Sequence, residues 1–164
     1  MARTVSALTV MFALVAAIAN ADEAGKGMAL SNAWKRIERL NAESAAAMPE
    51  ANYGFKPAPT VRSFGQIIGH LANDQYNLCS QAKGEANPKK SVDYEKTTAK
   101  ADLIKALDES NAYCDGVYGS TKNNDQKTLT TLLLNVTHDS EHYGNLVTYL
   151  RMKGIVPPSS QPSK

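Results

Sequence analysis

Two histidines, His138 and His142, lie four positions apart in a segment from about residue 128 to 153 whose apolar residues recur at helical spacing. Residues four positions apart project from the same side of a helix, so both imidazoles can reach one metal ion. The sequence has 3 histidines, and the third, His70, lies within another helical pattern. Three imidazoles form a complete facial set of nitrogen ligands. We therefore predict a divalent-metal centre formed by His70, His138 and His142.

The side of the last helix that carries the histidine pair also carries apolar residues, namely Leu134, Leu146 and Tyr149. This pattern is typical of a half-buried polar pocket between helices rather than of open surface. The alternative is that the histidines only form hydrogen bonds at the surface of the protein.

Two carboxylates lie near these histidines in the sequence. Asp74 follows His70 by one helical turn, whereas Glu141 points away from the histidine pair by roughly 60–100° on a helical wheel. A carboxylate beside a metal ligand can orient that ligand or transfer a proton. Asp74 is therefore the candidate catalytic residue, and the alternative that both carboxylates are structural or surface groups stays open.

Apolar residues recur at helical spacing in four segments, which predict helices at about residues 26–47, 63–84, 98–118 and 128–153. Ser63 and Gln66 form a capping-box pattern, and Gly84 and Gly154 lie where two of the helices should end. No segment alternates between polar and apolar residues for long enough to predict a strand. The predicted fold is an all-α four-helix bundle.

The linker between the second and third helices has about 13 residues, which can span roughly 40 Å, whereas a 20-residue helix is roughly 30 Å long. It can therefore cross back over the bundle and make these two helices parallel. Cys79 follows Ser63 by 16 positions, as Cys114 follows Thr98, so a parallel pair would bring the cysteines to the same height. We hypothesise a disulfide between them, with two buried free thiols as the alternative.

The N-terminus has the features of a secretory signal peptide: Arg3, an apolar run from Val5 to Ile18, and the sequence Ala19-Asn20-Ala21. We expect cleavage after Ala21, a bundle over residues 22–158 and a disordered tail over residues 159–164. The product would be secreted, or periplasmic in a Gram-negative host. The apolar run is shorter than the roughly 20 residues that a membrane span needs.

The charges are nearly balanced, with 18 basic and 16 acidic residues. Cleavage removes Arg3, which leaves 17 basic residues against 16 acidic ones, a net charge of +1. The sequence contains no basic stripe or block of like charge, which argues against nucleic acid or a membrane surface as the partner. The absence of C-x-x-C-H disfavours a c-type haem bundle.

Three stretches of the chain, residues 48–57, 63–72 and 138–158, resemble the DinB-like family of small helical metalloproteins. The second stretch contains His70, and the third contains the H-x-x-x-H pattern of His138 and His142. The resemblance implies a four-helix bundle with a crossover between helices two and three, a divalent ion (Zn, Ni or Fe) and frequent homodimerisation. Some relatives transfer or isomerise substrates with a cytoplasmic thiol cofactor, which an exported protein would not meet.

Two functions fit these features. The first is a metal-dependent hydrolase or transferase that acts on an unknown small substrate. The second is a non-catalytic bundle that is stabilised by its metal or binds a small ligand. A catalytic site should keep an open metal position beside a pocket, whereas a structural site should be closed by a fourth protein ligand.

Overall fold

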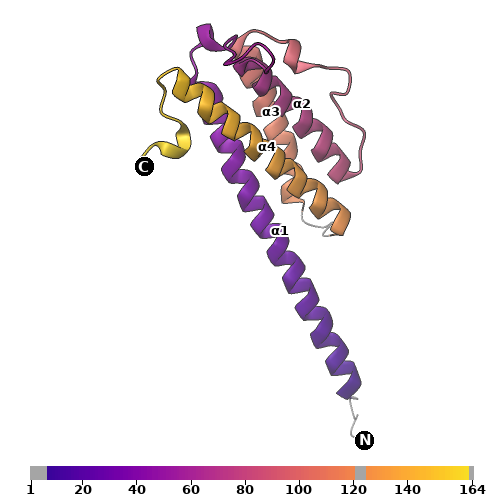
Figure 1. Ribbon diagram of the computed structural model, residues 1–164. Coiled ribbons are helices and arrows are strands. Elements are labelled where there is room, and N and C mark those ends of the chain that lie inside the picture. The colour runs from indigo at the N-terminus through magenta and orange to yellow at the C-terminus, as the bar shows by residue number, and fades with distance from the viewer. Residues whose placement is uncertain (1–6, 121–124, 163–164) are drawn as a thin grey trace, which may run out of the picture.

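In the computed structural model the chain is a bundle of helices that pack side by side (Figure 1). The structure describes residues 7–120 and 125–162, with side chains from residue 25 onward. Within these ranges it forms four α-helices and no strand: α1 (Ala7–Ala47), α2 (Phe64–Lys83), α3 (Lys100–Gly119) and α4 (Gln126–Met152). Three short 3-10 turns accompany them: η1 (Glu50–Asn52), η2 (Tyr94–Lys96) and η3 (Pro158–Ser160). The predicted all-α four-helix bundle is confirmed.

The capping residues of α2 take the conformations that their types predict. The Ser63 hydroxyl accepts a hydrogen bond from the backbone N–H of Gln66 at 3.2 Å, and the Gln66 side chain accepts one from the backbone N–H of Ser63 at 2.9 Å. Gly84 follows the last turn with a φ of 76°, in the left-handed region that glycine adopts without strain. Both ends of the helix that carries His70 are therefore fixed by local sequence.

The start of α1 differs from the prediction. The helix begins at Ala7 rather than near Lys26, because the intervening residues are rich in alanine and contain no proline. This N-terminal part projects beyond the other helices (Figure 1), and Trp34 is the first fully buried residue among the described side chains of α1. Cleavage after Ala21, which stays a prediction, would leave the packed part of α1 intact. A search of the described helices finds none that is long and apolar enough to cross a membrane.

Helices α2 and α3 run parallel, as the linker length predicts. Near their first turns, Leu103 lies 3.2 Å from the position that a Cβ on Gly65 would occupy. Near their last turns, Cys79 and Cys114 form a disulfide with Cα atoms 5.4 Å apart. The linker returns along the outside of α2 (Figure 1). The crossover and the disulfide are confirmed, and the alternative of two free thiols is wrong.

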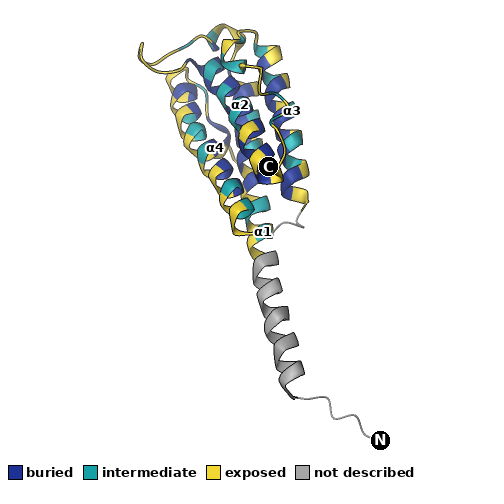
Figure 2. Ribbon diagram, turned by 90° about the vertical axis from the view of Figure 1, so that its right-hand side faces the viewer, coloured by how far each residue is buried: buried dark blue, intermediate teal, exposed yellow. Residues whose placement is uncertain are grey.

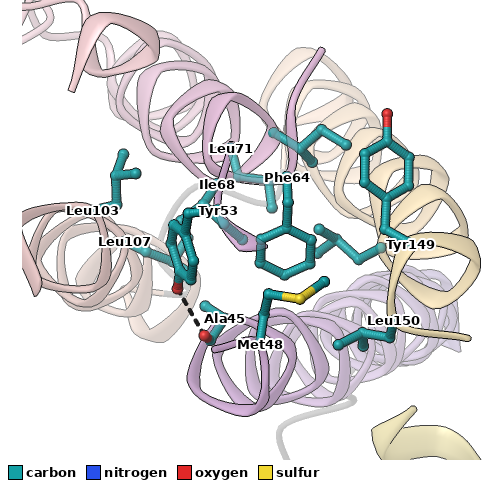
Figure 3. Packing of buried hydrophobic residues seen from close by; sticks show 12 residues of the cluster. Ala45, Met48, Tyr53, Phe64, Ile68, Leu71, Leu103, Leu107, Tyr149 and Leu150 are labelled. Atoms are coloured by element: carbon teal, nitrogen blue, oxygen red, sulfur yellow. Dashed lines mark hydrogen bonds between the residues drawn. The ribbon is translucent and has the colours of Figure 1, made fainter. Parts of the chain in front are cut away.

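The core consists of two apolar clusters, with buried residues facing inward on all four helices (Figure 2). At one end, Met48, Phe64 and Leu150 pack with Tyr53, whose hydroxyl donates to the Ala45 carbonyl at 2.7 Å (Figure 3). At the other end, the ring of Trp34 stacks on Tyr118 with centroids 5.0 Å apart. A buried polar layer separates the two clusters and takes one residue from each helix: Asn41, Gln75, Ser110 and Asp139.

Part of the segment expected to be a disordered tail forms a turn. Pro158 is buried, the backbone N–H of Ser159 donates to the Tyr143 hydroxyl at 2.9 Å, and Arg151 donates to the Ser160 hydroxyl at 3.1 Å. Residues 159 and 160 are therefore held against α4 rather than disordered. Residues 163–164 lie outside the described part of the chain.

Removing the disulfide tests how much the parallel pair depends on it. Because the disulfide closes a loop of 35 residues, replacing Cys79 and Cys114 together by alanine should lower the free energy of unfolding by about 3–4 kcal/mol. Urea denaturation of the oxidised protein and of the double variant measures this difference, and a reducing agent should weaken only the former. Two free thiols in the denatured, unreduced protein would contradict the disulfide.

Candidate metal centre

The three predicted ligands come together between α2 and α4. Nε2 of His138 lies 3.2 Å from Nε2 of His70 and 3.1 Å from Nε2 of His142. One potential ligand atom from each of the three histidines lies within 4.8 Å of the others. The side chains of His70 and His138 are 15% and 19% exposed, so the cluster is half-buried and open to solvent only in part. The arrangement follows from the helices, since His138 and His142 share one side of α4 and α2 packs against it.

Asp74 joins the same cluster. Its Oδ2 lies 3.1 Å from Nε2 of His70 and 3.0 Å from Nε2 of His138. These separations are similar to those between the imidazole nitrogens, so the carboxylate lies directly against two of the three predicted ligands. Glu141, by contrast, is exposed and makes no hydrogen bond or ion pair with the described residues.

Each imidazole has a polar neighbour at its other nitrogen. Oε1 of Glu95 lies 2.9 Å from Nδ1 of His70, and the Asn145 amide lies 3.3 Å from Nδ1 of His142. Oδ1 of Asp139 lies 3.7 Å from Nδ1 of His138. A carboxylate at Nδ1 favours the tautomer that carries its proton there, and this directs the Nε2 lone pair toward the centre of the cluster.

Glu95 reaches His70 because the crossover linker is held tightly on α2. A Cβ on Gly69 would lie only 2.4 Å from the Tyr94 carbonyl oxygen, so the close approach requires glycine at this position. Asn73 fixes the linker by accepting a hydrogen bond from the Tyr94 N–H at 3.1 Å and donating one to Asp93 at 3.2 Å. We refer to residues 93–96, which include η2, as the strap.

Asp139 connects the cluster to the centre of the bundle. Its side chain is 0% exposed, and its Oδ2 accepts hydrogen bonds from Gln75 at 2.8 Å and from Asn41 at 3.4 Å. Gln75 in turn accepts one from the Ser110 hydroxyl at 2.6 Å. On the other side, Oδ1 of Asp139 and Nδ1 of His138 are both buried without a hydrogen-bond partner and face each other. The buried polar layer therefore ends at His138.

The surroundings shift the pKa values of His138 and His142 in opposite directions. The neighbouring carboxylates, Asp139 first and then Asp74, raise the pKa of His138 to about 9. Burial, followed by the positive charges of His138 and His70, lowers the pKa of His142 to about 4. Burial raises the pKa of Asp139, whereas at Asp74 the hydrogen bond from His138 and the nearby imidazoles outweigh burial and lower the pKa. The cluster is thus arranged around a positive charge at His138.

The residues fit a divalent ion. Two nitrogens that each lie about 2.1 Å from one ion are about 3.0–3.4 Å apart, which matches the measured 3.1 and 3.2 Å. An ion would take the place of the proton that gives His138 its positive charge and would accept the Nε2 lone pairs of the three imidazoles. The cluster could therefore hold a metal ion.

The family comparison agrees with this geometry. The sequence model of the DinB superfamily matches residues 29–146, which include all three histidines. This chain belongs to the DinB superfamily. Proteins of this superfamily often bind metal, and the histidine cluster is consistent with that. A search of curated proteins finds no sequence that matches this DinB chain.

The sequence pattern of this DinB chain misplaced one residue and missed two others. Leu134, expected beside the histidines, is 54% exposed, because the buried face of α4 is centred on polar Asn135 and Asp139 as well as on its apolar residues. Asp139 follows His138 directly, but this gave no signal of burial, because consecutive residues on a helix point about 100° apart. Glu95 had no signal either, since only the path of the linker brings it to His70.

Neutralising Glu95 tests the role of the strap. The variant Glu95→Gln removes the charge at Nδ1 of His70 and should weaken metal binding by about tenfold or more. Competition with a chromophoric chelator measures this affinity. Glu141→Gln is the matched control, because it removes the same charge next to His142 from an exposed side chain. Equal affinity in wild type and Glu95→Gln would show that the strap does not act on the metal centre.

Proposed function

We propose that this DinB protein is exported, binds a divalent metal ion (Zn, Ni or Fe) at His70, His138 and His142, and acts as a metal-dependent hydrolase or transferase on a small substrate. The observation that carries the proposal is the convergence of three Nε2 atoms, at 3.1 and 3.2 Å, from two helices. Neutral imidazoles leave the charge of the ion intact, which suits a Lewis acid.

The surrounding residues support chemistry as well as binding. A bound ion of this kind polarises a carbonyl or lowers the pKa of a bound water toward about 7. A solvent-accessible hollow of about 710 Å³ adjoins His142, which gives a substrate access to the cluster. Asp74 lies close enough to hold or move a proton beside the cluster, and Glu95 and Asp139 keep the imidazoles oriented.

Two features support export. The apolar run from Val5 to Ile18 precedes the small residues Ala19 and Ala21, as in a cleavable signal peptide. The disulfide between Cys79 and Cys114 is typical of an oxidising compartment. Homodimerisation, which the family resemblance implies, stays a prediction.

Metal content tests the proposal. Wild-type protein purified without chelators or affinity tags should contain about one metal ion per chain, whereas His138→Ala should contain almost none, because two imidazoles hold an ion far more weakly than three. Elemental analysis measures both. Thr137→Ala, at the exposed neighbouring position, should keep its metal. Markedly substoichiometric metal in the wild type would contradict the proposal.

Asp74 favours a second candidate function. Because its oxygen lies 3.0–3.1 Å from two of the ligand nitrogens, it can complete a four-ligand site of the structural type, which is closed to substrate. The protein would then be a metal-stabilised or small-ligand-binding bundle without catalysis. The hollow beside His142 favours the first function over this one, since a purely structural site needs no access route.

Azide binding to the cobalt-substituted protein separates the two functions. If the site keeps an open position, azide should change the visible absorption of the wild-type protein in a saturable way. If Asp74 closes the site, the wild type should not respond and Asp74→Ala should gain the response. A response in the wild type that Asp74→Ala leaves unchanged would contradict the structural alternative.

A further inference from the structure

The hollow beside His142 is formed by three parts of the chain: the loop between α1 and α2, the first turns of α2, and the last turns of α4. The strap completes it through Glu95. Its volume of about 710 Å³ is in the range of small-molecule sites. The polar and charged residues that line it include Lys56, Arg62, Gln66, Glu95, His142 and Asn145.

The hollow is lined by only part of the histidine cluster and its neighbours. His142 and Glu95 line it, whereas His138 and Asp74 do not. A molecule in the hollow would meet the cluster at His142.

Arg62 is held in place at the wall of this hollow. Its carbonyl accepts a hydrogen bond from the Tyr149 hydroxyl at 2.7 Å, and its Nε donates to Oε2 of Glu95 at 2.9 Å. Its two terminal nitrogens make no hydrogen bond to the described residues, and its side chain is 43% exposed. A guanidinium fixed through Nε in this way still presents two donors that suit a carboxylate or a phosphate.

Lys56 adds a second positive charge on the same wall. It forms no ion pair with the residues that the structure describes, so no carboxylate competes for its ammonium group. Glu95 is the one acidic residue in the lining, and its two oxygens already contact His70 and Arg62. The rest of the wall offers apolar surface chiefly from Pro57 and Val61, since Ile67 and Tyr149 also line it but are almost fully buried.

We propose that the hollow binds a small organic anion, a carboxylate or phosphate with an apolar body, with its oxyanion on Arg62 and Lys56 and its remaining part directed toward His142. This inference rests on the proposed function, since it names the class of substrate that the metal centre would meet. A fixed guanidinium with free terminal N–H groups, a lysine without an ion pair to the described residues, and an apolar wall are the features that recognise such a molecule.

Calorimetric titration of the metal-loaded protein with benzoate, phenyl phosphate and neutral benzamide tests this assignment. At least one of the two anions should bind about tenfold or more tightly than benzamide, the ordinary gain from a hydrogen bond to a charged group. Arg62→Met should remove that preference, and Lys56→Met should reduce it. Lys90→Met is the control, because it removes an exposed lysine outside the hollow and should change nothing.

Measuring the metal content of each variant distinguishes a failure of the proposed metal-dependent function from a failure of the proposed anion site. Lys56 contacts none of the histidines, so Lys56→Met should keep its metal even where Arg62→Met disturbs Glu95. If the wild type holds no metal, the proposed function fails, while a preference for the anions that depends on Lys56 would still support this site. Equal binding of the anions and benzamide, no binding of any probe, or anion affinities unchanged in both variants would overturn the inference.

Discussion

The buried carboxylate of Asp139 is the constraint on which this structure depends. An ionised carboxylate at the centre of a bundle costs several kcal/mol unless hydrogen bonds and a positive charge compensate it. Gln75 and Asn41 donate to one of its oxygens, and the other faces His138. Since His138 belongs to the histidine cluster, a cation held there would stabilise the carboxylate from the opposite side of the imidazole ring. The core and the metal centre therefore form one electrostatic unit.

Residues from all four helices and from the strap take part in this coupling. The polar layer takes one residue from each of the four helices, and the strap adds Glu95 from the crossover linker. The disulfide between α2 and α3 fixes the parallel pair that the linker joins, and Gly69 lets the linker approach α2 closely. Each of these contacts limits how far the imidazoles can move. These contacts hold the three imidazoles close together, as a preorganised metal centre would require.

Much of the fold and the ligand set follows from local sequence, whereas the surroundings of the site do not. The four-residue spacing of His138 and His142 and the capping box at Ser63 are local signals, and the equal offsets of Cys79 and Cys114 report helix register. Asp139 was hidden because apolar periodicity assigns polar residues to the surface, although here a polar layer lies inside the core. Glu95 was hidden because it lies 25 residues from His70 along the chain and meets it only through the path of the linker.

The central claim is that three imidazoles from two helices hold one ion. X-ray absorption at the metal edge of the metal-loaded protein tests it most directly. We expect scattering from three imidazole rings with metal–nitrogen distances of about 2.0–2.1 Å, and almost no metal signal in His138→Ala. A metal edge without imidazole scattering, or a wild-type protein that takes up no divalent ion, would contradict the account.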